Sequence, residues 1–184
     1  MKKSIFVILF SAGAYFSADE QKFYTKNGSI SFFSKTNMEN ISAVNNQVMS
    51  VLVPQTGTFE FSLLVKGFHF EKALMEEHFN ENYLESSTFP NAQFKGQISN
   101  LSEINFSQDG KYNAKASGKL TIHGVERDVN VEGTVKVSKG SVEILSNFVV
   151  KPEDYKIAIP SLVRDNIAKE IKVTVSAVLQ PLKS

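Results

Sequence analysis

The sequence predicts an all-β protein: a single domain of about eight antiparallel strands with one or two short helices, folded as a β-barrel or a strongly bent sandwich. Apolar and polar residues alternate with period two through most of the chain after residue 20, which is typical of half-buried strands. Gly, Asn and Pro separate these runs at short intervals, as turns between consecutive antiparallel strands require. No change of composition divides the chain, and that many strands in one domain must close or expose edges.

Nine alternating segments predict the strands in chain order. They are 28–35, 41–44, 47–53, 58–66, 92–98, 111–123, 127–137, 141–150 and 171–179. Asn45 and Asn46 are interpreted as a turn between the second and third segments. Two interruptions predict helices. Segment 70–84 combines strong helix formers with apolar residues at three-to-four spacing, and segment 161–169 follows Pro160 as one short helix.

Residues 1–18 have the layout of a bacterial secretory signal peptide. Lys2 and Lys3 precede a short apolar run at 4–10, and small residues follow it. This run is much shorter than the roughly 20 apolar residues of a membrane-spanning helix. We therefore expect cleavage after Ala14 or Ala18, export to the periplasm, no transmembrane span, and a single mature domain at 19–184.

Composition excludes several classes of function. The chain of 184 residues has no Cys, which rules out disulfides, Fe–S clusters, a thiol nucleophile and a lipoprotein anchor. Twenty basic residues against 19 acidic ones leave no positive excess for binding nucleic acid. No G-x-S-x-G motif or Gly-rich phosphate loop occurs, and His69, His78 and His123 stand in no metal-binding motif. We predict no catalytic residue, no metal and no cofactor.

The aromatic residues favour an apolar interior, because the chain has 15 Phe, 5 Tyr and no Trp. One face of segment 111–123 carries Ala114, Ala116 and Gly118, which are too small to fill a barrel. Either Phe side chains from facing strands or a ligand must occupy that space. The candidate ligand-lining residues are Ile30, Phe32, Phe59, Phe61, Leu63, Leu74, Met75, Phe79, Phe94, Tyr112 and Ala114.

The helix around 74–83 is expected to cover one end of the barrel, as a lid or as a structural plug, with Leu74, Met75 and Phe79 facing inward. His78 lies on the same side by spacing. Because neutral imidazole both donates and accepts hydrogen bonds, His78 is the candidate for the polar end of a ligand. The alternative is that His78 bonds only to a neighbouring loop.

Three ordered strings carry a resemblance to a known family. FHFEKALMEEHFNENY starts at Phe68 and leads to Glu85 and Ser86; GKLTIHGV starts at Gly118; DYKIAIP starts at Asp154. In this order and spacing the chain resembles the YceI-like family, in the compact form found in Bacteroidetes-type bacteria. The resemblance covers essentially the whole mature chain. It implies a lipocalin-like barrel whose apolar tunnel holds a polyisoprenoid or another long lipid, without catalytic residues.

Two hypotheses of function follow. The first is a periplasmic, non-catalytic binding protein for a long apolar lipid, of polyisoprenoid or fatty-acyl type, that carries, stores or scavenges it. The second is a protein-interaction module whose barrel is filled by its own side chains. The sequence leaves open the identity of the lipid and whether the protein forms a homodimer.

Overall fold

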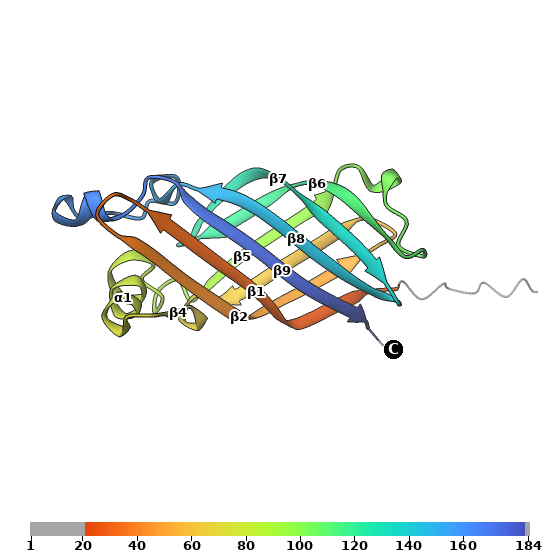
Figure 1. Ribbon diagram of the computed structural model, residues 1–184, viewed down its shortest axis with the longest axis horizontal. Coiled ribbons are helices and arrows are strands. Elements are labelled where there is room, and N and C mark those ends of the chain that lie inside the picture. Colours follow the sequence, from red (N-terminus) through yellow and green to blue (C-terminus); the bar gives the residue numbers. More distant parts are fainter. Residues whose placement is uncertain (1–20, 183–184) are drawn as a thin grey trace, which may run out of the picture.

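The computed structural model describes residues 21–182, so the expected signal peptide at 1–18 lies outside the described residues. Eight strands form a closed antiparallel barrel, as predicted (Figure 1). They are β1 (Phe23–Lys35), β2 (Asn40–Val53), β3 (Thr58–Leu64), β5 (Asn91–Ile98), β6 (Gly110–Ile122), β7 (Val125–Ser138), β8 (Ser141–Val150) and β9 (Ile171–Pro181). Around the barrel the order is β1-β9-β8-β7-β6-β5-β3-β2, and β2 pairs with β1 to close it. The short β4 (His69–Phe70) pairs with β2 beyond the end of β3.

The helical segments are short and lie in the connections. They are η1 (Val65–Gly67), α1 (Ala73–His78), η2 (Phe79–Tyr83), η3 (Leu101–Glu103), η4 (Pro152–Tyr155) and η5 (Ser161–Asn166). The helix predicted at 70–84 is present as α1 followed by a single π-helical turn, η2. The helix predicted at 161–169 is a 3₁₀-helix, η5, rather than an α-helix.

The predicted turn at Asn45 and Asn46 is wrong, because β2 runs through both residues. Between Gly28 and Ile30 of β1 the pairing with β2 shifts, so β2 has an extra residue there. This β-bulge breaks the period-two pattern and imitates a turn in the sequence. Asn45 is fully buried and stabilises the bulge, since its Nδ2 donates to the Leu64 carbonyl at 2.9 Å and its Oδ1 accepts from Gln47 N–H at 2.8 Å.

Two hairpins are closed by tight turns at the predicted glycines. His123 and Gly124 join β6 to β7, with φ values of 51° and 70°, and Lys139 and Gly140 join β7 to β8 with 50° and 76°. Positive φ at both central residues is the signature of a type I′ turn, whose twist matches that of the strands.

One end of the barrel is filled by side chains, and we call it the closed half. It is the end that carries both termini of the described chain and the β7–β8 turn (Figure 1). Six of its inward side chains are at most 4% exposed: Phe23, Val48, Val137, Val142, Ala177 and Leu179. Leu101, Ile104 and Phe106 of the β5–β6 loop pack against this cluster. The closed half is therefore an ordinary hydrophobic core.

The other end, near α1 and η5, is the hollow half. Here β7 and β8 separate: their pairing starts at Gly133 and Ser146, and beyond this point β7 pairs only with β6 and β8 only with β9. Ser146 Oγ donates to the Glu132 carbonyl at 2.6 Å where the strands part. The segment between β8 and β9 supplies apolar side chains to the cavity at this end.

Candidate functional site

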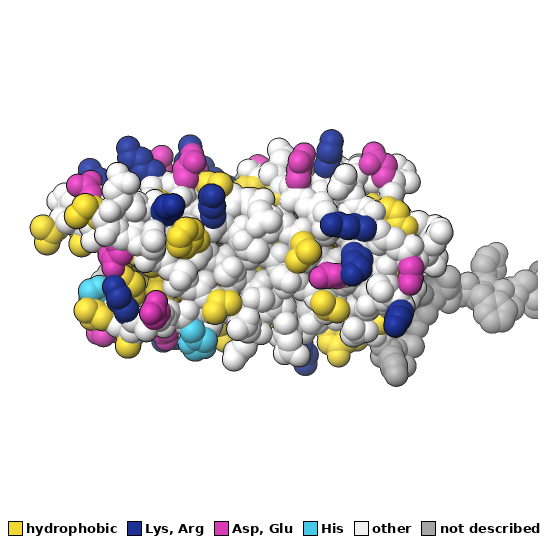
Figure 2. Space-filling view, viewed as in Figure 1, with side chains coloured by type: hydrophobic (Ala, Val, Ile, Leu, Met, Phe, Trp, Pro, Cys, Tyr) yellow, Lys and Arg dark blue, Asp and Glu magenta, His cyan; other side chains and the backbone are white. Residues whose placement is uncertain are grey.

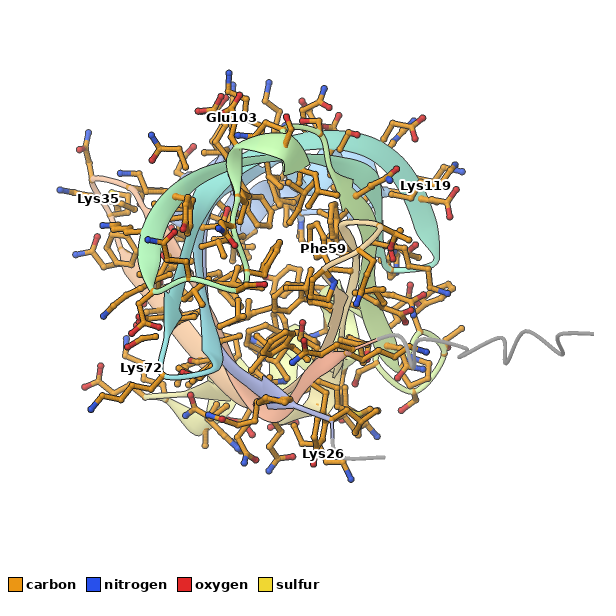
Figure 3. The ribbon with its side chains drawn as sticks, turned by 90° about the vertical axis from the view of Figure 1, so that its right-hand side faces the viewer. Lys26, Lys35, Phe59, Lys72, Glu103 and Lys119 are labelled. Carbon is orange, nitrogen blue, oxygen red and sulfur yellow. The ribbon has the colours of Figure 1, made fainter. Side chains whose placement is uncertain are left out.

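An apolar cavity of about 390 Å³ occupies the hollow half. Volumes of a few hundred Å³ are typical of pockets that bind small organic ligands. The cavity is lined from every strand of the barrel and from α1, η2 and the 151–170 segment. In the view along the barrel, Phe59 points into the interior, whereas the labelled Lys and Glu side chains point outward (Figure 3). The hollow half can therefore enclose an apolar molecule.

Most of the predicted ligand-lining residues surround this one cavity. Those that line it are Ile30, Phe32, Phe59, Phe61, Leu63, Met75, Phe79, Phe94 and Ala114, together with His78. Leu74 does not, and the expectation that it faces inward is wrong: its side chain is 61% exposed on the outer side of α1. Tyr112 is placed by the inward face of β6 against the core of the closed half, so it lies outside the cavity lining.

Two clusters of Phe rings form one wall. Phe32, Phe68, Phe70 and Phe79 meet where α1 and η2 cover the barrel, with ring centroids 5.0 to 5.7 Å apart. Phe59, Phe61 and Phe94 pack on β3 and β5 with centroids 5.3 and 6.0 Å apart. These separations are those of attractive aromatic pairs. The wall is consequently held in place by its own contacts.

The wall beside it, on the neighbouring strand β6, is made of small residues, as the face of β6 predicted. Ala114 and Ala116 line the cavity, and Gly118 follows on the same face. A Cβ at Gly118 would lie 2.3 Å from the Lys95 carbonyl and 2.8 Å from the Phe94 ring, so only glycine fits. Small residues on this wall leave the space that the Phe wall does not fill.

Sequence reasoning missed the part of the lining that comes from the C-terminal third of the chain. Ile144 and Phe148 of β8, Val173 of β9, and Ile157 and Val163 of the connecting segment all line the cavity. Alternation in β8 and β9 places their inward residues on a core face, but it does not distinguish a filled end from a hollow one. The irregular segment 151–170 has no period at all.

Three polar side chains, one from each of three connections, meet at the rim of the cavity. Glu39, in the β1–β2 turn, accepts hydrogen bonds from Lys72 Nζ at 3.1 Å and from Asn166 Nδ2 at 3.3 Å. Glu39 and Asn166 line the cavity, and Lys72 does not. The hydrogen bond from Lys72 is the main cause that lowers the pKa of Glu39 below its usual 4.5, so this carboxylate is ionised at neutral pH.

His78 also lines the cavity, at the C-terminal end of α1, with its side chain largely in solvent. Its role toward the polar end of a ligand stays a prediction. Among residues 21–182 no group of three His, Asp or Glu side chains is arranged to hold a metal ion.

Residues of the three recognised strings meet beside the cavity. His123 Nε2 lies 2.6 Å from Glu85 Oε2, and His123 Nδ1 lies 3.2 Å from the Tyr155 carbonyl oxygen. The Phe89 ring packs edge-on against the imidazole at 4.6 Å. This arrangement joins the β6–β7 turn to the segment that follows η2 and to the end of η4. His123 is thus a structural residue, and its contacts join the three strings in space.

Comparisons with known proteins agree with this architecture. The YceI-like domain profile matches residues 11–179. The chain belongs to the YceI-like family. No curated protein sequence matches it.

Among solved structures, a polyisoprenoid-binding domain from Saccharophagus degradans superposes with a TM-score of 0.76 at 12% identity, covering 89% of this chain and 99% of that one. BcnA from Burkholderia cenocepacia gives 0.69 at 16% identity, with 83% and 95% covered. The YceI protein of Campylobacter jejuni gives 0.55 at 13% identity and covers both chains fully. At these identities the likeness shows the shared fold.

The outer surface of this YceI-like protein is mixed in character. The face in Figure 2 shows apolar side chains as separate patches among polar ones. Within the described part of the chain, no helix has the length and apolar character needed to cross a membrane.

Proposed function

We propose that this YceI-like protein is a non-catalytic periplasmic binding protein for a long-chain lipid, which it holds in the hollow half. The observation that carries the proposal is the apolar cavity between the Phe wall and the small-residue wall. The Saccharophagus relative is described as a polyisoprenoid-binding domain, which supports the same class of ligand. Because the cavity lies within one chain, a monomer or a homodimer can perform this role.

The binding energy would come from the chain of the lipid. Each buried methylene gains about 0.8 kcal/mol, so about ten of them gain roughly 8 kcal/mol, which corresponds to a micromolar dissociation constant before ordering costs. A flexible chain also suits a lining that contains Met75, whose side chain adapts to irregular shapes.

The alternative, a protein-interaction module, rests on a barrel filled by its own side chains. Only the closed half meets that condition, whereas the hollow half retains about 390 Å³. Lipid binding is therefore the function that the geometry supports better.

Extraction of lipid from the purified mature protein tests the proposal. Mass spectrometry of the extract should find a long-chain lipid near one molecule per chain. Ala114→Trp, which fills the cavity, should carry no bound lipid. The matched control Val178→Trp, at a half-exposed position on the outside of β9, should carry as much lipid as the wild type. An empty wild type that also fails to bind added polyprenol, or equal loading of both variants, would contradict lipid binding in the barrel.

A further inference from the structure

The charged side chains that line the cavity are of one sign. Among the described residues that line it, the formally charged ones are Glu39 and Glu132, and none is Lys or Arg. Glu132 is exposed at the gap between β7 and β8, which leaves Glu39 as the half-buried charge at the rim. An anionic group in the cavity would meet a carboxylate first.

The segments that frame the hollow half have the same bias. Residues 35–40, 65–90, 123–128 and 151–170 contain eight Lys and Arg but twelve Asp and Glu, although basic residues are slightly in excess in the whole chain. Charges gathered around a low-dielectric opening raise or lower the local concentration of charged ligands. The net negative charge of these segments therefore disfavours acidic ligands at this end of the barrel.

Glu39 retains capacity for a ligand. Each of its oxygens accepts one hydrogen bond, from Lys72 or Asn166, and a carboxylate has about four acceptor positions. Its place does not depend on its own side chain, because the turn is held by backbone groups and the Thr36 hydroxyl: Thr36 N–H donates to the Glu39 carbonyl at 3.0 Å, and Glu39 N–H donates to Thr36 Oγ1 at 3.0 Å. The carboxylate is a preorganised acceptor at the rim.

We infer that Glu39 and Asn166 form a subsite for the polar end of the lipid, and that this subsite takes an uncharged hydrogen-bond donor such as a hydroxyl and rejects carboxylates and phosphates. The inference rests on the proposed function and narrows it from lipids of polyisoprenoid or fatty-acyl type to those with a non-acidic end. Lys72 does not reverse the preference, because its ammonium group lies outside the lining and is paired with Glu39.

Matched probes with one chain length test this subsite. Hexadecanol and palmitate would each displace the uncharged fluorescent probe N-phenyl-1-naphthylamine from the delipidated mature protein at pH 7.5. Hexadecanol should act at a concentration at least tenfold lower than palmitate. In Glu39→Gln the difference should shrink below threefold, mainly through tighter palmitate binding. Glu77→Gln is the matched control, because Glu77 is exposed on α1 and does not line the cavity.

Each outcome decides the inference. Equal displacement by both probes in the wild type, or a preference unchanged in Glu39→Gln, overturns the subsite while leaving lipid binding intact. Lys72→Met should preserve the preference for hexadecanol. If instead the wild type binds palmitate tightly and Lys72→Met loses that binding, the polar end of the lipid occupies an anion site formed by Lys72. If neither compound displaces the probe, the proposed function itself fails.

Discussion

The two halves of the barrel share their strands but differ in what fills them. In the closed half, Val142 and Leu179 face each other on β8 and β9 with no exposed surface. A few residues further along the same pair of strands, Phe148 and Val173 also face each other, and there they line a cavity. Strand alternation is the same in both places. The difference arises from the facing residues and the connections.

Two features produce the difference. In the closed half the β5–β6 loop brings Leu101, Ile104 and Phe106 onto the core. In the hollow half the facing positions on β6 and β7 are small, as at Ala114 and Gly133, and the β7–β8 ladder stops. A barrel of this size can be packed or hollow, and side-chain volume on one wall decides which. Stability should therefore come mainly from one half, and binding from the other.

Removing volume from the closed half should have the largest effect on stability. Leu179→Ala deletes part of a fully buried side chain and should lower the free energy of unfolding by about 2–5 kcal/mol. Urea denaturation followed by circular dichroism measures it. Leu162→Ala, at a position 93% exposed in η5, should be close to neutral. A loss below about 1 kcal/mol for Leu179→Ala would show that the closed half is not the stabilising core.

Adding side-chain volume should have different effects on stability in the two halves. Ala177→Leu in the closed half overpacks a side chain that is 2% exposed and should cost about 1–3 kcal/mol. Ala114→Leu adds the same atoms beside the cavity and should leave stability unchanged while weakening the binding of long chains. Denaturation and probe displacement measure both variants. Similar destabilisation by the two would mean that the hollow half is packed in solution.

Replacing His78, in the hollow half, should have a smaller effect, and on ligand affinity only. If its imidazole contacts the polar end of a lipid, His78→Leu removes one hydrogen bond worth about 1 kcal/mol and should weaken hexadecanol binding several-fold without changing stability. Displacement assays at pH 7.5 measure this. Unchanged affinity would remove His78 from the site and leave the polar end to Glu39 and Asn166.

The smallest expected effect is the pH dependence of the rim. The pKa of Glu39 is lower in the folded protein than its usual 4.5, chiefly through the hydrogen bond from Lys72, so ionised Glu39 stabilises the fold above that pH. This stabilisation is lost as the pH falls through the lowered pKa. The melting temperature of Glu39→Gln should be slightly below that of the wild type at pH 7, and the difference should vanish in acid. If the difference in melting temperature between the two proteins grew as the pH fell, ionised Glu39 would not be stabilising the fold.

Much of the barrel could be predicted from sequence because alternation reports which face of a strand is buried. Prediction from alternation failed where the period-two pattern is interrupted. The β-bulge at Asn45 resembled a turn, and β1 begins at Phe23 rather than at the predicted residue 28, because another shift of register separates Thr25 from Gly28.

The cavity was harder to predict than the fold. Alternation along the strand places Tyr112 and Ala114 on one face of β6. In the structure, however, Tyr112 packs in the closed half and Ala114 lines the cavity. Which half is hollow depends on irregular connections, such as the β5–β6 loop and the segment 151–170, whose packing has no sequence period. The rim shows the same limit, because Glu39 and Asn166 are 127 residues apart and only the closed barrel brings them together.

The most direct test of lipid binding in the hollow half is a crystal structure of the protein with 16-bromo-1-hexadecanol, using the anomalous signal of the bromine. The structure predicts one bromine position inside the barrel, between the Phe wall and Ala114, with the hydroxyl end toward Glu39. A bromine on the outer surface or within the closed half would contradict the assignment of binding to the hollow half.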